Sequence, residues 1–158
     1  MSGVLRIVAL VALLGGAIAL AACGDDGSRE EKNAYVREVN AAQEAFAARV
    51  TSVSQEITPQ SSPARDRRTL ERFETAIESV VDQLRAIDVP QDVEAEHEQL
   101  VEAMTDFGTE INKATTALRN PDTRSIAEAQ RAVTAATQTV NGRIDAAIAA
   151  INSKLREA

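Results

Sequence analysis

Apolar residues recur along this chain at steps of three and four, in four separate stretches. This spacing places them on one face of an α-helix, with polar residues covering the rest of each turn. The stripes are Val36, Val39, Phe46, Val50, Val53 and Ile57, with Gln43 filling a gap; Leu70, Phe73, Ile77, Val80, Leu84 and Ile87; Val93, His97, Leu100, Met104, Phe107, Ile111, Ala114 and Leu118; and Ile126, Val133, Val140, Ile144, Ile148, Ile151 and Leu155. The pattern predicts four amphipathic helices.

Prolines separate the stretches, because the residue before a proline is disfavoured in the α region. The predicted breaks are Thr58-Pro59, Asp88-Val89-Pro90 and Asn120-Pro121-Asp122. Helix-start signals follow each break and precede the first stripe. They are Ser28 with Glu31 as a capping box, Ser62 with Pro63 at the first helical position, Pro90, and either Asp122 or Thr123. We therefore expect helices over residues 29–57, 63–87, 90–119 and 123–155.

Four such helices joined by short loops pack most simply as an antiparallel, up-down-up-down four-helix bundle. The predicted fold class is all-α, with one domain over residues 29–158. The composition agrees, since alanine is abundant, aromatic residues make up 3% of the chain and tryptophan is absent. Asn141-Gly142 interrupts the last stretch, but the apolar register continues across it. We expect one last helix there, straight or kinked.

The chain opens with a segment of a different kind. Arg6 is followed by an apolar run over residues 7–19, broken only by Gly15 and Gly16, and then by small residues. This is the layout of a secretory signal peptide, which is left out of fold reasoning. An uncleaved membrane helix is the alternative, since residues 7–24 give 18 uncharged positions and about 17–25 can span a bilayer. The lack of a basic stop-transfer cluster favours a cleaved leader.

The leader ends in Leu20-Ala21-Ala22-Cys23, and Cys23 is the only cysteine of the chain. This tetrapeptide resembles the lipobox of bacterial lipoproteins. The resemblance implies a diacylglycerol thioether on Cys23, cleavage behind Ala22, a leader over residues 1–22 and a lipidated linker over residues 23–28. The protein would then be exported and anchored to the outer face of the cell membrane, its partner there being membrane lipid. A thiolate suits this chemistry because it is a good nucleophile. A cysteine that follows a signal peptide by chance is the alternative.

The rest of the chain excludes several functions. Its formal charge is −7, which argues against general nucleic-acid binding because that requires a basic face. No serine lies in a nucleophile elbow and no glycine-rich loop could hold a phosphate, so we expect no enzyme. Glu94-x-x-His97 has the spacing used in di-iron bundles, but such sites need two of these motifs and the chain has one histidine. We therefore expect no metal and no cofactor.

His97 occupies a core-facing position of the third stripe. Counting from the loops places Asp145 at a similar level on the last helix. We expect a polar contact between the two, in which the carboxylate would raise the pKa of the imidazole.

Antiparallel topology also gathers charge at the two ends. The first and third loops lie at the end far from Cys23, here called the tip, and Arg65, Arg67, Arg68, Arg119 and Arg124 lie near them, with Arg72 further along. The other end, the base, gathers acidic residues: Asp25, Asp26, Glu30, Glu31, Asp88, Asp92, Glu94 and Glu96. The polarity predicts a basic tip that meets an envelope protein or an anionic polymer. Ordinary solvated charge, with Asp66 and Asp122 partly cancelling the arginines, is the alternative.

The mature chain resembles uncharacterised helical lipoproteins of high-GC Gram-positive bacteria, an origin that its 14 arginines against 3 lysines fit. The sequence favours a non-enzymatic interaction or structural module of the cell envelope. A bundle that binds a small ligand or acts as a sensor, through a cavity between helices, is the second hypothesis. The oligomeric state stays open.

Overall fold

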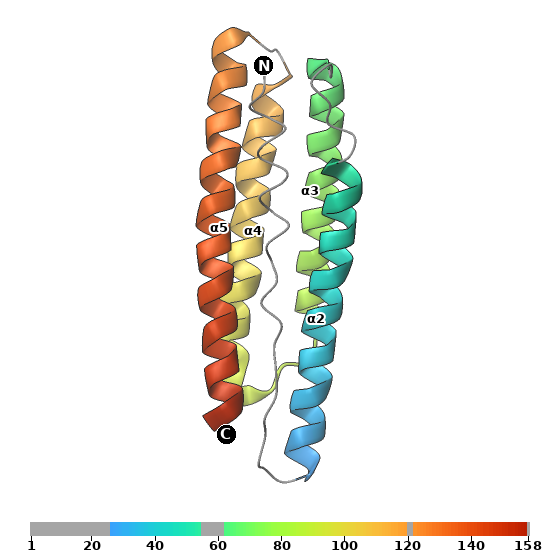
Figure 1. Ribbon diagram of the computed structural model, residues 1–158, viewed down its shortest axis with the longest axis vertical. Helices are drawn as coiled ribbons and strands as arrows, with labels where there is room; N and C mark the ends of the chain where they lie inside the picture. Colours follow the sequence, from blue (N-terminus) through green and yellow to red (C-terminus); the bar gives the residue numbers. More distant parts are fainter. Residues whose placement is uncertain (1–25, 55–61, 120–121, 158) are drawn as a thin grey trace.

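The computed structural model describes residues 26–54, 62–119 and 122–157. Four long helices fill these ranges, with a short 3-10 turn and no strand among the described residues. They are α2 (Asp26–Ser54), α3 (Pro63–Arg85), η2 (Gln91–Val93), α4 (Glu94–Ala117) and α5 (Thr123–Glu157). Figure 1 shows the helices side by side along one long axis with alternating directions. The predicted all-α helical bundle is confirmed. The predicted leader and lipobox lie outside the described residues.

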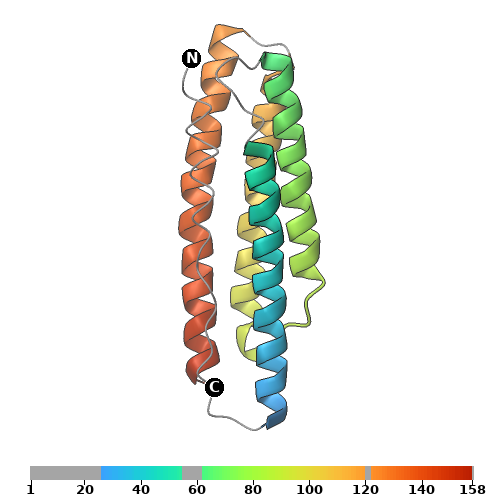
Figure 2. The same ribbon diagram turned by 45° about the vertical axis from the view of Figure 1, so that its right-hand side comes forward.

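Each helix packs on the next one in the chain: α2 on α3, α3 on α4 and α4 on α5. The turn η2 contacts both α4 and α5. The base is the end where α2 and α4 begin, and the tip is the end where α3 and α5 begin (Figures 1 and 2). The last turn of α5 lies at the base.

Helix α2 begins earlier than expected. It starts at Asp26, so Ser28 lies inside its first turn and the predicted capping box at Ser28 is wrong. Part of the expected linker over residues 23–28 is therefore helical. The run of acidic residues in this sequence favours an early start, because negative charge in the first turns interacts favourably with the helix dipole. The expected helix end at Ile57 lies outside the described residues.

The third helix also starts differently. Pro90 was expected to open it, but Pro90 has φ −59° and ψ 139° and precedes η2 instead. The Val93 N–H donates to the Pro90 carbonyl at 3.0 Å, which closes this turn, and α4 then begins at Glu94. A 3-10 turn has fewer residues per turn than an α-helix. Val93 therefore lies in the core directly after the loop.

The other two helix starts follow the prediction. Ser62 is the N-cap of α3, with Pro63 in its first turn. Asp122 caps α5, because the Ser125 N–H donates to Asp122 Oδ1 at 2.7 Å and the Asp122 N–H donates to Ser125 Oγ at 2.9 Å. The hydrogen bond that the Ser125 backbone N–H donates to the carboxylate, together with one from the Ser125 side chain, lowers the pKa of Asp122. Helix α5 continues through Gly142, so the expectation of one last helix is confirmed.

The core consists of the predicted stripes, with a few additions. Nearly all described stripe residues are buried, while Leu70, Ile87, Leu118 and Ile126 are half-buried. All three phenylalanines meet in the middle: Phe46 and Phe73 stack with ring centroids 6.2 Å apart, and Phe73 meets Phe107 edge-on at 5.6 Å. Such distances are favourable for aromatic pairs. The rings therefore join α2, α3 and α4 in one core.

Candidate functional site

His97 is the centre of a buried polar cluster near the base. It is 5% exposed, and its Nε2 lies 3.0 Å from the carbonyl oxygen of Leu84. Because a carbonyl oxygen only accepts, Nε2 must carry the proton in the neutral ring. Nδ1 is then the acceptor for the Tyr35 hydroxyl, 3.2 Å away. One chain of hydrogen bonds thus runs from α2 through α4 to the end of α3.

The expected contact between His97 and Asp145 is wrong. Both ring nitrogens already have other partners, and Asp145 is exposed on α5. The expected direction of the pKa is wrong for the same reason. Burial disfavours the charged imidazolium and lowers the pKa of His97, and the hydrogen bond to Leu84 offsets this only in part. Counting from the loops gave the level of Asp145 along the rod but not the direction of its side chain.

Sequence reasoning missed the two other polar members of this region, Tyr35 and Lys32. Tyr35 is 1% exposed, and its burial, with the nearby charge of Glu96, raises the pKa of the phenol well above its ordinary value. Lys32 lies one turn earlier on α2 and is also buried; its Nζ lies 3.1 Å from Asp92 Oδ2 of η2. Tyr35 precedes the stripe residue Val36 directly, and Lys32 lies four residues before Val36. Both were therefore within reach of the inward face.

The cluster favours a structural role over catalysis. Tyr35 is held protonated and His97 neutral, and each has a partner for its polar atoms. A general base must reach a substrate proton, and these groups are sealed in the core. Within the described ranges, no group of three or more potential metal ligands is present. The arrangement instead pins α2, α3 and α4 to one another near the base.

The tip arginines form a second, exposed group. Arg65, Arg68, Arg119 and Arg124 are exposed, and Arg67 is half-buried. Arg67 pairs with Glu71 at 3.3 Å and Arg124 with Glu128 at 3.5 Å, both one helical turn away. Within the part of the chain that the structure describes, Arg65, Arg68 and Arg119 form no ion pair. The structure therefore places all five predicted arginines at the tip, and two of them, Arg67 and Arg124, pair with a glutamate of their own helix.

The base is more mixed than the sequence suggested. Its acidic residues include Glu30, Asp88 and Glu94, all exposed. However, the last turn of α5 brings Lys154 and Arg156 to the same end, and Asp92 is paired with Lys32. The sequence expectation omitted these cations, because the end of α5 was not counted with the base.

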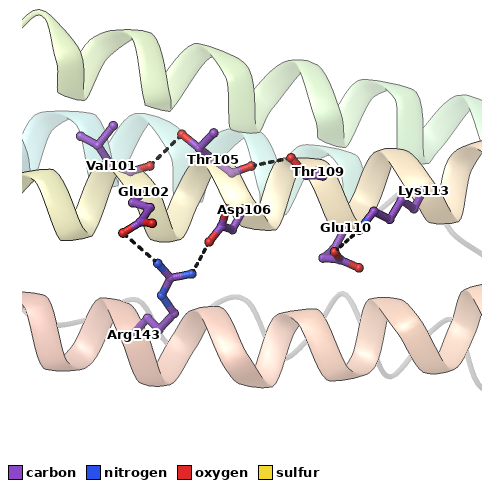
Figure 3. Close-up of polar contacts among 8 residues, drawn as sticks. All are labelled: Val101, Glu102, Thr105, Asp106, Thr109, Glu110, Lys113 and Arg143. Carbon is purple, nitrogen blue, oxygen red and sulfur yellow. Dashed lines mark hydrogen bonds and ion pairs between the residues drawn. The ribbon is translucent and has the colours of Figure 1, made fainter.

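An arginine clamp further along the bundle holds α5 on α4. Figure 3 shows Arg143 of α5 reaching across to two carboxylates of α4. Its guanidinium lies 3.5 Å from Glu102 Oε2 and 2.5 Å from Asp106 Oδ2. All three side chains are more than one-third exposed, so the contribution to stability is small. The clamp fixes the register of the two helices. The carboxylates of Glu102 and Asp106 balance the positive charge of Arg143.

Comparison with family models, with curated proteins and with solved structures gives no match. Among the described residues, no helix is long and apolar enough to cross a bilayer.

Proposed function

We propose that this protein is a lipid-anchored, non-enzymatic module of the cell envelope, which holds a helical rod on the membrane by its base and interacts through its tip. The observation that carries the proposal is the leader ending in Leu20-Ala21-Ala22-Cys23. Two acyl chains on Cys23 would hold the protein far more firmly than one, since each buried CH₂ contributes about 0.8 kcal/mol.

The bundle supports this proposal through its geometry. Helix α2 begins at Asp26, three residues after Cys23, so an anchor there would sit directly under the base. Helix α5 has 35 residues, which at about 1.5 Å per residue gives a rod about 50 Å long. The tip arginines lie at the far end of this rod (Figure 1). An anchored rod would therefore carry them well away from the membrane surface.

The core favours an interaction module over a small-ligand receptor. The phenylalanine rings fill the middle of the bundle, and Ile111 and Ile151, which are fully buried, fill positions toward the tip and the base. Ligand sites in bundles need a chamber between the helices. The described side chains at these three levels are apolar and buried, which supports the interaction module.

Substitution of Cys23 tests the anchor. The full-length chain and its Cys23→Ser variant are expressed in a Gram-positive host fed with a clickable fatty acid. We expect the wild type to carry the lipid label and to lose 22 residues, as intact-mass measurement would show. The Cys23→Ser variant should remain an unlabelled, full-length precursor, because serine lacks the nucleophilic thiolate.

Gly24→Ala is the matched control, since it changes the adjacent residue and leaves the tetrapeptide intact. It should be labelled and cut like the wild type. Normal labelling and processing of the Cys23→Ser chain would refute lipid anchoring.

A further inference from the structure

The exposed arginines of the tip have no role in the packing of the bundle. Arg65 and Arg68 lie on one face of the first turns of α3, Arg119 follows the end of α4, and Arg124 lies in the first turn of α5. Neighbouring helix axes in bundles are about 8–10 Å apart. The four guanidinium groups therefore come from α3, from α5 and from the segment after α4, and they spread over one end of the molecule.

The charge of the tip comes from its side chains and not from the backbone. Two helices begin and two end there, so the helix dipoles largely cancel. Asp66 and Asp122 are the acidic residues nearest to the five arginines in the sequence, and Asp122 accepts hydrogen bonds from the first turn of α5. Glu71 and Glu128 pair with Arg67 and Arg124, so among the described residues the tip cations without an ion pair are Arg65, Arg68 and Arg119.

We propose that the tip binds a linear polyanion, a polymer that repeats phosphate or carboxylate groups along its length. Exposed arginines gain little from any single anion, because water and salt screen each pair. Appreciable affinity requires many simultaneous contacts. A polymer supplies them and adds the free energy of releasing its condensed counterions. A small anion would need converging groups in one pocket, and these arginines are spread out.

Charge elsewhere on the rod confines the polymer to the tip. The exposed face of α4 carries Glu94 and Glu98, and Asp88 lies just before η2. Such carboxylates repel a polyanion over the lower part of the rod. A second copy bound head-to-tail, base on tip, is the other arrangement that the charges allow. Anchoring of both copies by their bases would oppose it.

This inference rests on the proposed function in one respect, namely that the anchor leaves the tip free. It is tested with the lipidated protein reconstituted in vesicles of neutral phosphatidylcholine. Fluorescently labelled inorganic polyphosphate and poly-glutamate are the two probes, and binding is measured at about 50 and 200 mM salt, a range in which polyanion affinity changes steeply.

We expect the wild-type protein to bind polyphosphate with an affinity that falls as salt rises. The Arg65→Glu/Arg68→Glu variant should bind about tenfold more weakly and show a salt slope smaller by about two, one unit for each lost contact. Arg37→Glu/Lys154→Glu is the matched control. It changes the net charge by the same amount at exposed positions in the half of the rod near the base, and it should stay within about twofold of the wild type.

The two probes distinguish the sources of anionic groups. Binding of polyphosphate alone assigns a phosphate-bearing polymer, and binding of both assigns a general polyanion. The proposal fails if neither polymer binds, if both variants lose affinity equally, or if charge reversal at the tip changes only self-association of the protein. Thermal unfolding of each variant by circular dichroism separates lost binding from lost fold. If Cys23 carries no lipid but the protein still binds the polymers, only the proposed lipid anchor is refuted. If the protein is lipidated but binds neither polymer, only the proposed polyanion site at the tip is refuted.

Discussion

At the scale of single residues, the fold holds His97 as a neutral base. The Leu84 carbonyl fixes the proton on Nε2, and the Tyr35 hydroxyl donates to Nδ1. A second proton would have to enter at Nδ1, where it would meet the hydroxyl proton and place a charge in the core. The lowered pKa of His97 expresses this cost.

The sign of the resulting pH dependence follows from linkage. In the unfolded chain His97 takes up a proton near its ordinary pKa of 6.5, whereas in the folded chain it does so only at lower pH. The stabilisation is thus complete above pH 6.5 and is lost as the pH falls below it. We expect the free energy of unfolding to decrease there by at most about 1.4 kcal/mol per pH unit, the limit for one proton.

His97→Gln isolates this effect, because a glutamine amide can donate to Leu84 and accept from Tyr35 but does not titrate. Urea unfolding of both proteins between pH 7.5 and 5 is the measurement. The carboxylates titrate alike in both, so the difference between the two curves reports on His97. Parallel curves over this range would show that His97 does not titrate differently in the two states.

At the scale of helices, the two interior glycines differ in their surroundings. A Cβ at Gly108 would lie 3.2 Å from Cγ2 of Ile77, a side chain that is 1% exposed. A Cβ at Gly142 would meet nothing within 4 Å. Gly108 therefore allows α4 to pack closely on α3, while Gly142 has no such role in α5.

This contrast predicts opposite results for the same substitution. Gly142→Ala should stabilise the protein by about 0.5–1 kcal/mol, because alanine loses less backbone freedom on forming a helix. Gly108→Ala should gain less or destabilise, since the β-branched side chain of Ile77 has little freedom to move aside. Chemical denaturation of the two variants is the measurement. A larger gain at position 108 than at position 142 would contradict the packing argument.

At the scale of the whole molecule, the core is continuous from base to tip. Tyr35 and Val39 are buried near the base, and Phe46, Val50 and Val53 continue the row along α2. A domain of this size with one core usually unfolds in a single step. The rod should therefore behave as one cooperative unit.

Phe46→Ala tests this cooperativity. Truncating a buried phenylalanine costs about 3–5 kcal/mol, and Phe46 lies three turns from Tyr35, the only tyrosine. We expect unfolding followed by tyrosine fluorescence, which reports on the base, to shift together with unfolding followed by far-ultraviolet circular dichroism. A shift in the dichroism curve that leaves the fluorescence curve in place would indicate independent segments.

Much of this architecture could be predicted from the sequence. The spacing of apolar residues gave the four helices, and Pro63 and Asp122 gave two of the helix starts. The polar partners were harder to predict, as His97 shows: its inward direction follows from the stripe, but its contacts do not. Tyr35 lies 62 positions before His97 in the chain. The Leu84 carbonyl can accept a hydrogen bond from His97 because it lies in the last turn of α3.

The sequence by itself therefore determined the helices, their order and the placement of the arginines at the tip, because these depend on the periodicity of side chains along one chain and on the direction in which each helix runs. It also carries the lipobox on which the proposed anchor rests. Only the tertiary structure decided which polar atoms meet inside the bundle and which glycine is needed for close packing. Those features depend on the rotation and register of each helix against its neighbours, which are set by the packing of the whole core.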